Sequence, residues 1–156
     1  MAGWRRSRPG KALVTVSIVR LVRAYRFAAS HLYRRPEWSE EENRRRFGAC
    51  ATEPGHGHNY RLEIALEGEP DRETGFVADL PALDALVRRL VVEELDHRHI
   101  NHAILEFAPG GRIPSCENLV LWIVSVLERE LPGGARLEGV RLFESEDLGA
   151  EWTHPR

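Results

Sequence analysis

Residues 58–66 read His-Asn-Tyr-Arg-Leu-Glu-Ile-Ala-Leu, and they carry the most regular side-chain pattern in the chain. Every second position shares one face, and that set is His58, Tyr60, Leu62, Ile64 and Leu66. Because successive side chains of a strand point to opposite faces, this alternation predicts a β-strand with one buried face. Two imidazoles, His56 and His58, would project from that same face at the start of the strand.

The segments around this strand predict a mixed fold. Alternation predicts further strands over about 13–29, 75–79 and 140–144. Helical spacing of apolar residues predicts helices over 81–95 and 117–131, the second with Ser115 as N-cap. Ser39 and Glu42 form a capping-box pattern that predicts a short helix through Arg46. The order of these elements indicates an α+β domain built on an antiparallel sheet.

The length and charge of the chain narrow the possible classes. A chain of 156 residues fits one domain, which we expect over residues 12–156, after a disordered tail at 1–11. The formal net charge of -2 gives no basic field of the kind that binds nucleic acid.

No stretch approaches the roughly 20 apolar residues that span a bilayer, so we expect no membrane partner. The apolar run after Arg5 and Arg6 is short and broken by charge, which disfavours an export signal. Cys50 and Cys116 lie far apart, a distribution more typical of a reduced cytoplasmic protein than of a disulfide framework.

His56 and His58 are candidate metal ligands. Two imidazoles two residues apart on a strand can share one ion, and catalytic zinc sites commonly use three protein ligands and an open fourth position. His31, at the end of the first predicted strand, is the best third ligand. A His-x-His pair also occurs as a surface or structural feature, so spacing alone leaves both interpretations open.

Three further residues can move protons. Cys50 precedes the histidine pair by a short loop and could act as a base, although free cysteines also serve as small buried apolar residues. Asp96 and His97 follow the first long helix, and a carboxylate can orient a neighbouring imidazole. An Asp-His pair is also common at a helix end.

Two glutamates have alternative interpretations. Glu144 lies on an otherwise apolar strand face, where a carboxylate needs a partner such as a ligand with two adjacent donors, unless the strand frays and the side chain reaches water. Glu117 could bind a ligand or simply favour the N-terminal end of its helix.

Several motifs together resemble the 6-pyruvoyl-tetrahydropterin synthase family. They are Ala29-Ser30-His31, Ser39 to Asn43, Phe47-Gly48-Ala49-Cys50, Gly55 to Tyr60, Leu95-Asp96-His97 and Glu117-Asn118. The similarity covers residues 14–145. It implies Zn²⁺ bound by His31, His56 and His58, Cys50 as base, and Asp96 with His97 as the proton-transfer pair. It also implies Glu144 as pterin anchor and catalytic residue, with Glu117 and Ser115 as candidate substrate-binding residues.

The same resemblance implies a tunnelling fold (T-fold), with two helices packed on one face of an antiparallel sheet. In this family, strands of several subunits form an oligomeric barrel, commonly a hexamer, with active sites between subunits. Glu144 would then meet the metal group across an interface.

The implied activity is that of a lyase of tetrahydrobiopterin biosynthesis, which converts 7,8-dihydroneopterin triphosphate to 6-pyruvoyl-tetrahydropterin. A relative in queuosine biosynthesis, 6-carboxytetrahydropterin synthase, uses similar residues and releases acetaldehyde. The five residues between Cys50 and His56 resemble the pyruvoyl type. A metal-bearing pterin-binding protein without catalysis is the third possibility.

Overall fold

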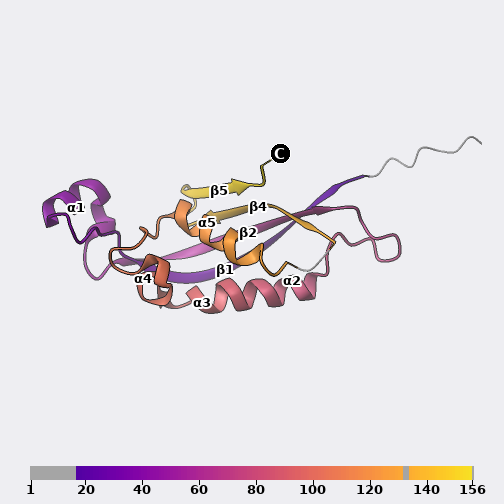
Figure 1. Ribbon diagram of the computed structural model, residues 1–156, viewed down its shortest axis with the longest axis horizontal. Helices are drawn as coiled ribbons and strands as arrows, with labels where there is room; N and C mark the ends of the chain where they lie inside the picture. Colours follow the sequence, from indigo (N-terminus) through magenta and orange to yellow (C-terminus); the bar gives the residue numbers. More distant parts are fainter. Residues whose placement is uncertain (1–16, 132–133, 156) are drawn as a thin grey trace, which may run out of the picture.

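The computed structural model describes residues 17–131 and 134–155. Its central feature is the long antiparallel pair of β1 (Val19–His31) and β2 (His56–Gly68), seen side by side in Figure 1. The pairing runs without a break from Val19 opposite Gly68 to His31 opposite His56. The register therefore places two histidines that are distant in the sequence next to each other. Both strands extend further toward the histidines than the alternation predicted, and residues 1–16, including the expected tail, lie outside the described residues.

The sheet has five strands in the order β3-β1-β2-β4-β5. β4 (Arg136–Phe143) pairs antiparallel with β2, with an irregularity at Ala65 and Leu66, and β5 (Gly149–Thr153) pairs antiparallel with β4. The short β3 (Arg98–His99) lies parallel to β1. The α+β class is confirmed, and β5 is a strand that the sequence pattern did not predict.

The strand predicted over 75–79 is wrong. The Asp71 carboxylate accepts hydrogen bonds from the amides of Glu73 and Thr74, and the Gly75 amide donates to the Asp71 carbonyl oxygen. These bonds close a compact turn, so the polar backbone groups are satisfied locally and no ladder forms. The chain then enters α2 (Leu80–Val87), where the Asp79 carboxylate caps the first turn by accepting from the Ala82 amide.

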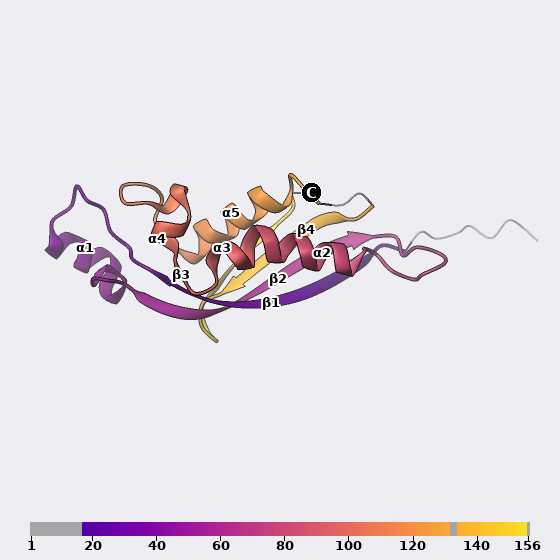
Figure 2. The same cartoon turned by 90° about the horizontal axis from the view of Figure 1, so that it is seen from below.

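The helices that form the core lie on one face of the sheet, as Figure 2 shows. α2 continues through a π-helical turn at Arg88–Val92 into α3 (Glu93–Leu95), which matches the predicted helix over 81–95. α5 (Cys116–Leu127) begins after the Ser115 cap as predicted but ends four residues early, because the exposed residues 128–130 present no apolar face.

Buried side chains of β2, β4 and these helices fill the space between the two layers. The largest of them include Tyr60, Leu62, Ile64, Leu66, Leu83, Leu119, Ile123, Leu127 and Leu142. The opposite face of the sheet carries no helix in Figure 2. Ion pairs cover part of that face, for example Arg20 with Glu138 and Arg141 with Glu151. Within the described ranges, no helix is long and apolar enough to cross a membrane.

α1 (Glu40–Phe47) lies at the end of the β1–β2 pair. The Ser39 hydroxyl accepts a hydrogen bond from the Glu42 amide, which confirms the predicted helix start. A 3-10 turn at Gly48–Ala51 follows directly and carries Cys50. α4 (Ile100–Ala103) and a 3-10 turn at Leu105–Phe107 connect β3 to the loop before α5.

Ile64 gives a test of the core. Its side chain is fully buried in the strand between β1 and β4. We expect Ile64→Ala to lower the free energy of unfolding by about 2–5 kcal/mol, because it leaves a cavity between sheet and helices. Leu105→Ala, at a side chain that is 90% exposed, should change it by less than about 0.5 kcal/mol. Urea unfolding measures both, and equal effects would contradict this assignment of the core.

Candidate functional site

Three imidazoles meet at the end of the β1–β2 pair. His31 is the last residue of β1, and His56 and His58 are the first and third residues of β2. Their ring centroids lie 4.8 Å (His31 to His56), 4.9 Å (His31 to His58) and 4.7 Å (His56 to His58) apart. The structure thus brings together the three histidines that the sequence singled out.

His31 is the most enclosed of the three, with no exposed surface. Its Nδ1 lies 3.0 Å from the hydroxyl oxygen of Tyr60, whereas its Nε2 is buried and has no hydrogen-bond partner among the described residues. Burial, followed by the neighbouring imidazoles of His58 and His56, lowers the pKa of His31 to about 3. The ring is therefore neutral at physiological pH, which is the form that binds a metal.

The donor atoms around these rings fit a metal ion. The ligand atoms of His31, Cys50 and His56 lie within 4.8 Å of one another, and so do those of His31, His58 and Glu144. Within residues 17–131 and 134–155, His58 Nε2 and Glu144 Oε2 are also buried without hydrogen-bond partners. Unpaired buried polar atoms cost free energy, and a shared cation would satisfy them. Imidazole nitrogens with one sulfur or carboxylate nearby are a donor set that suits zinc.

Cys50 lies beside the histidines on its 3-10 turn. Its Sγ is 3.9 Å from His56 Nε2, and its carbonyl oxygen accepts a hydrogen bond from the Tyr33 amide just after β1. Burial, and next the Glu144 carboxylate, raise the pKa of the Cys50 thiol. A nearby positive charge is therefore needed to form the thiolate at neutral pH.

Glu144 follows the last residue of β4 and lies in the same group. β4 ends at Phe143, as the alternative of a fraying strand expected, but Glu144 is only 9% exposed and one of its carboxylate oxygens is buried, so the side chain does not simply reach water. The expectation that Glu144 meets the metal group across an interface is also wrong, because it lies near His31 and His58 of its own chain. The Glu144 amide donates to the Leu148 carbonyl oxygen, which fixes the turn into β5.

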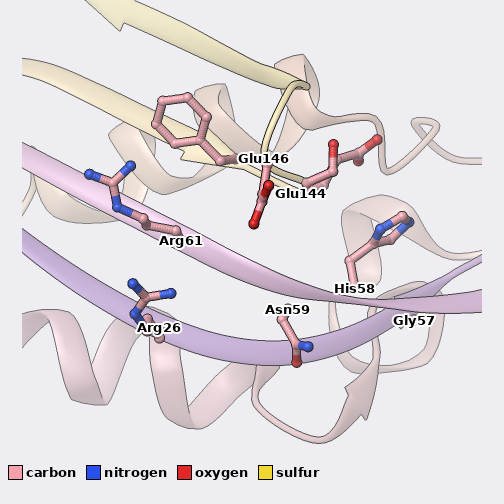
Figure 3. A pocket seen from close by; sticks show the side chains of 9 residues that line it. Arg26, Gly57, His58, Asn59, Arg61, Glu144 and Glu146 are labelled. Carbon is pink, nitrogen blue, oxygen red and sulfur yellow. The ribbon is translucent and has the colours of Figure 1, made fainter.

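A cavity of about 740 Å³ opens beside His58 and Glu144 (Figure 3). Arg26 and Arg61, directly opposed in the β1–β2 register, line it together with Glu146. The Arg61 guanidinium also lies 5.3 Å from the ring centroid of Phe143. The sequence analysis did not identify Arg26 and Arg61, for which the only available signal was their place on the polar face of the two strands.

Asp96 and His97 lie where α3 returns to β1. One Asp96 oxygen accepts from the Ala28 amide at 2.8 Å, and the other is 3.0 Å from His97 Nδ1. The Ala28 contact lowers the pKa of Asp96, with a smaller contribution from His97, so the carboxylate stays charged. The His97 amide donates to the Ala28 carbonyl oxygen at 2.6 Å. These bonds hold His97 at a φ of 57°, with its side chain 81% exposed.

The His97 side chain lines a second cavity, of about 430 Å³, which also includes His58. Ser115 and Glu117 are placed differently. The Ser115 hydroxyl caps α5 by accepting from the Asn118 amide, and Glu117 is exposed in the first turn of that helix. Neither residue lines either of these two cavities.

Gly55 controls the loop that joins Cys50 to His56. Its φ is +98°, a region that residues with a Cβ atom rarely adopt. A Cβ built there would lie 2.2 Å from the carbonyl oxygen of His31. The close approach of this loop to β1 therefore requires glycine.

We expect Gly55→Ala to weaken metal binding by about tenfold or more, a loss like that on removing a partner that orients a ligand. The added methyl group must push His56 and Cys50 away from His31. Gly75→Ala is the matched control, since Gly75 also has a positive φ, +75°, but has no atom within 4 Å of the added Cβ. Competition with a chelating dye measures both affinities. Equal losses in the two variants would show that backbone strain, not the contact with His31, is responsible.

Comparisons with known proteins agree with this geometry. A family model described as 6-pyruvoyl tetrahydropterin synthase matches residues 20–155. The chain therefore belongs to this family, and the tunnelling fold and the enzyme class expected from the resemblance are confirmed.

Three relatives show how close the similarity is. The human 6-pyruvoyl tetrahydrobiopterin synthase is 33% identical over 121 residues, which cover 78% of this chain and 81% of the human one. A dihydroneopterin monophosphate aldolase from Pyrococcus furiosus is 32% identical over 132 residues, 85% of this chain and 95% of the relative. The structure of Caenorhabditis elegans 6-pyruvoyl tetrahydropterin synthase superposes with a TM-score of 0.82 at 28% identity, covering 90% of this chain and 98% of that one.

Proposed function

We propose that this protein is a zinc-dependent lyase that converts 7,8-dihydroneopterin triphosphate to 6-pyruvoyl-tetrahydropterin and releases triphosphate. The observation that carries the proposal is the cluster of His31, His56 and His58 with the Cys50 sulfur 3.9 Å from His56 Nε2. Family membership over residues 20–155 supports it, and supports one pterin synthase domain over residues 12–156.

His31, His56 and His58 would hold the ion. All three lie at the end of one strand pair, and the Nε2 atoms of His31 and His58 have no hydrogen-bond partner in the part of the chain that the structure describes. Bound zinc acts as a Lewis acid that polarises side-chain oxygens of the substrate and acidifies the adjacent C–H groups. The reaction needs no external oxidant, because its electrons balance within the substrate. Two hydroxyl carbons become ketones and lose four electrons; two of these reduce the dihydropterin ring, and two convert the carbon that loses triphosphate to a methyl group.

Cys50 is the proposed base for a carbon-bound proton of the substrate side chain. It lies beside the three histidines and within the field of any cation they hold, which counteracts the effect of burial on its pKa. His97, oriented by the charged Asp96, is proposed to carry protons during tautomerisation.

Glu144 is the proposed anchor for the pterin ring and a catalytic residue. Its buried carboxylate has one oxygen without a partner, and it borders the cavity in Figure 3. A pterin ring has two adjacent N–H groups, and such a carboxylate can accept a hydrogen bond from each of them. Glu117 and Ser115 remain proposals as substrate contacts, and in this chain they lie outside the two cavities beside His58.

A cytoplasmic homo-hexamer completes the proposal. The sheet face without a helix and the exposed His97 side chain are features that a neighbouring subunit could cover. The active site would then combine groups from adjacent subunits.

Turnover of 7,8-dihydroneopterin triphosphate by the zinc-loaded protein is the direct test. We expect a pyruvoyl product by mass analysis, with release of triphosphate and no acetaldehyde. Carboxypterin with acetaldehyde would instead identify 6-carboxytetrahydropterin synthase, and a shortened side chain with glycolaldehyde phosphates would identify an aldolase. Binding without turnover would identify a pterin-binding protein.

Two variants distinguish a residue that acts as the base from a residue that binds the metal. We expect Cys50→Ala to abolish turnover and keep its zinc, because the three imidazoles remain. His58→Ala should lose both, since it removes one of three ligands. Elemental analysis measures zinc content alongside the turnover assay. Loss of zinc from the cysteine variant would refute the assignment of Cys50 as a base that does not bind the metal.

A further inference from the structure

We propose that Tyr60 is a positioning residue that fixes the ring of His31 so that its Nε2 atom, and not Nδ1, binds the metal. The inference rests on the zinc centre proposed above and adds a residue that neither the sequence pattern nor the family motifs assign to it. It concerns metal binding, which can be measured without substrate.

The contact that carries the inference is fully enclosed. The Tyr60 hydroxyl oxygen lies 3.0 Å from His31 Nδ1, and the two residues are 1% and 0% exposed. With its second nitrogen buried and unpaired, His31 has one atom committed to Tyr60 and one directed to the site. A metal-binding imidazole commonly donates its other N–H to a protein acceptor, which sets both tautomer and orientation.

The position of the Tyr60 hydroxyl is set by the strand pairing. Tyr60 lies directly opposite Phe27 in the β1–β2 register, and their rings stack at 5.0 Å with an interplanar angle of 16°. The Tyr60 ring also contacts the edge of His58, at a centroid distance of 5.8 Å. These two contacts, together with the full burial of Tyr60, restrict the movement of its hydroxyl away from His31.

A phenol also suits both states of the site. In the metal-bound state, Nδ1 carries the proton, and the Nδ1–H group donates a hydrogen bond to the Tyr60 oxygen. Without metal, the Tyr60 O–H can donate to an unprotonated Nδ1, so the same contact persists with its polarity reversed. A carboxylate in this place could only accept from the neutral ring, and it would add a negative charge to the site.

Tyr60→Phe tests the role by removing only the hydroxyl. We expect the dissociation constant for zinc to rise by about 10–100-fold, the usual loss when a partner that orients a ligand is removed. The matched control is Tyr25→Phe, on the adjacent strand, where the phenol donates to Asp84 at 2.9 Å and the residue lies opposite Leu62 in the register. Zinc affinity should be unchanged in the control, and both constants come from chelator competition on the full-length protein.

Nitrogen NMR of the unmodified protein gives a second measurement that does not depend on how the variants fold. In the zinc-loaded state, we expect His31 to show a protonated Nδ1 with slow hydrogen exchange, and a metal-bound Nε2. Zinc bound through Nδ1, no zinc binding by the unmodified protein, or less than a twofold change in affinity in a folded Tyr60→Phe variant would overturn the inference. Failure to turn over pterin with normal zinc binding would instead contradict only the proposed function.

Discussion

The site depends on the register of the β1–β2 pair. Thirteen residues of each strand pair without interruption, and the last pair is His31 with His56. A slip of one residue would move the side chains of a strand to the opposite face. The imidazoles would then separate, and Tyr60 would leave both the core and His31. Apolar burial along Leu62, Ile64 and Leu66 is what makes such a slip costly.

The polar atoms at the end of this pair have an energetic cost that the core must offset. His31 Nε2, His58 Nε2 and Glu144 Oε2 are all buried and find no hydrogen-bond partner among the residues that the structure describes. Each such group costs about 1–3 kcal/mol relative to a paired one. The apolar core between the sheet and the helices offsets this cost. The fold can therefore keep polar atoms that gain a partner only when a ligand binds.

The fold was predictable to the extent that local pattern determines it. Alternation identified β2, and helical spacing with the Ser39 and Ser115 caps identified α1 and α5. β5 was missed because Gly149–Thr153 is a short edge strand with little alternation to detect. The false strand at 75–79 had strand-like residues, but the Asp71 side chain closes a turn there. Whether such a short segment forms a strand or a turn depends on its contacts in the folded chain, and these contacts are not visible in one sequence.

The residues of the candidate site likewise fall into those that the sequence could identify and those that only the structure shows. The histidines, Cys50, Asp96 and Glu144 were identifiable because their residue types and spacing match a known family. Tyr60, Arg26 and Arg61 were not, because their significance depends on which residue of another strand lies opposite them. The approach of the Gly55 loop to the carbonyl of His31 is likewise visible only in three dimensions.

β2 extends beyond β4, and the mouth of the cavity follows from this difference. The β2–β4 ladder ends at Arg61 opposite Phe143, so residues 56–60 have a strand partner on one side only. Each residue pair added to that ladder would cover about 3.4 Å more of β2. The difference in length between β2 and β4 therefore sets the width of the opening beside His58. A longer or shorter β4 would change this width without changing the residues that would react with a ligand.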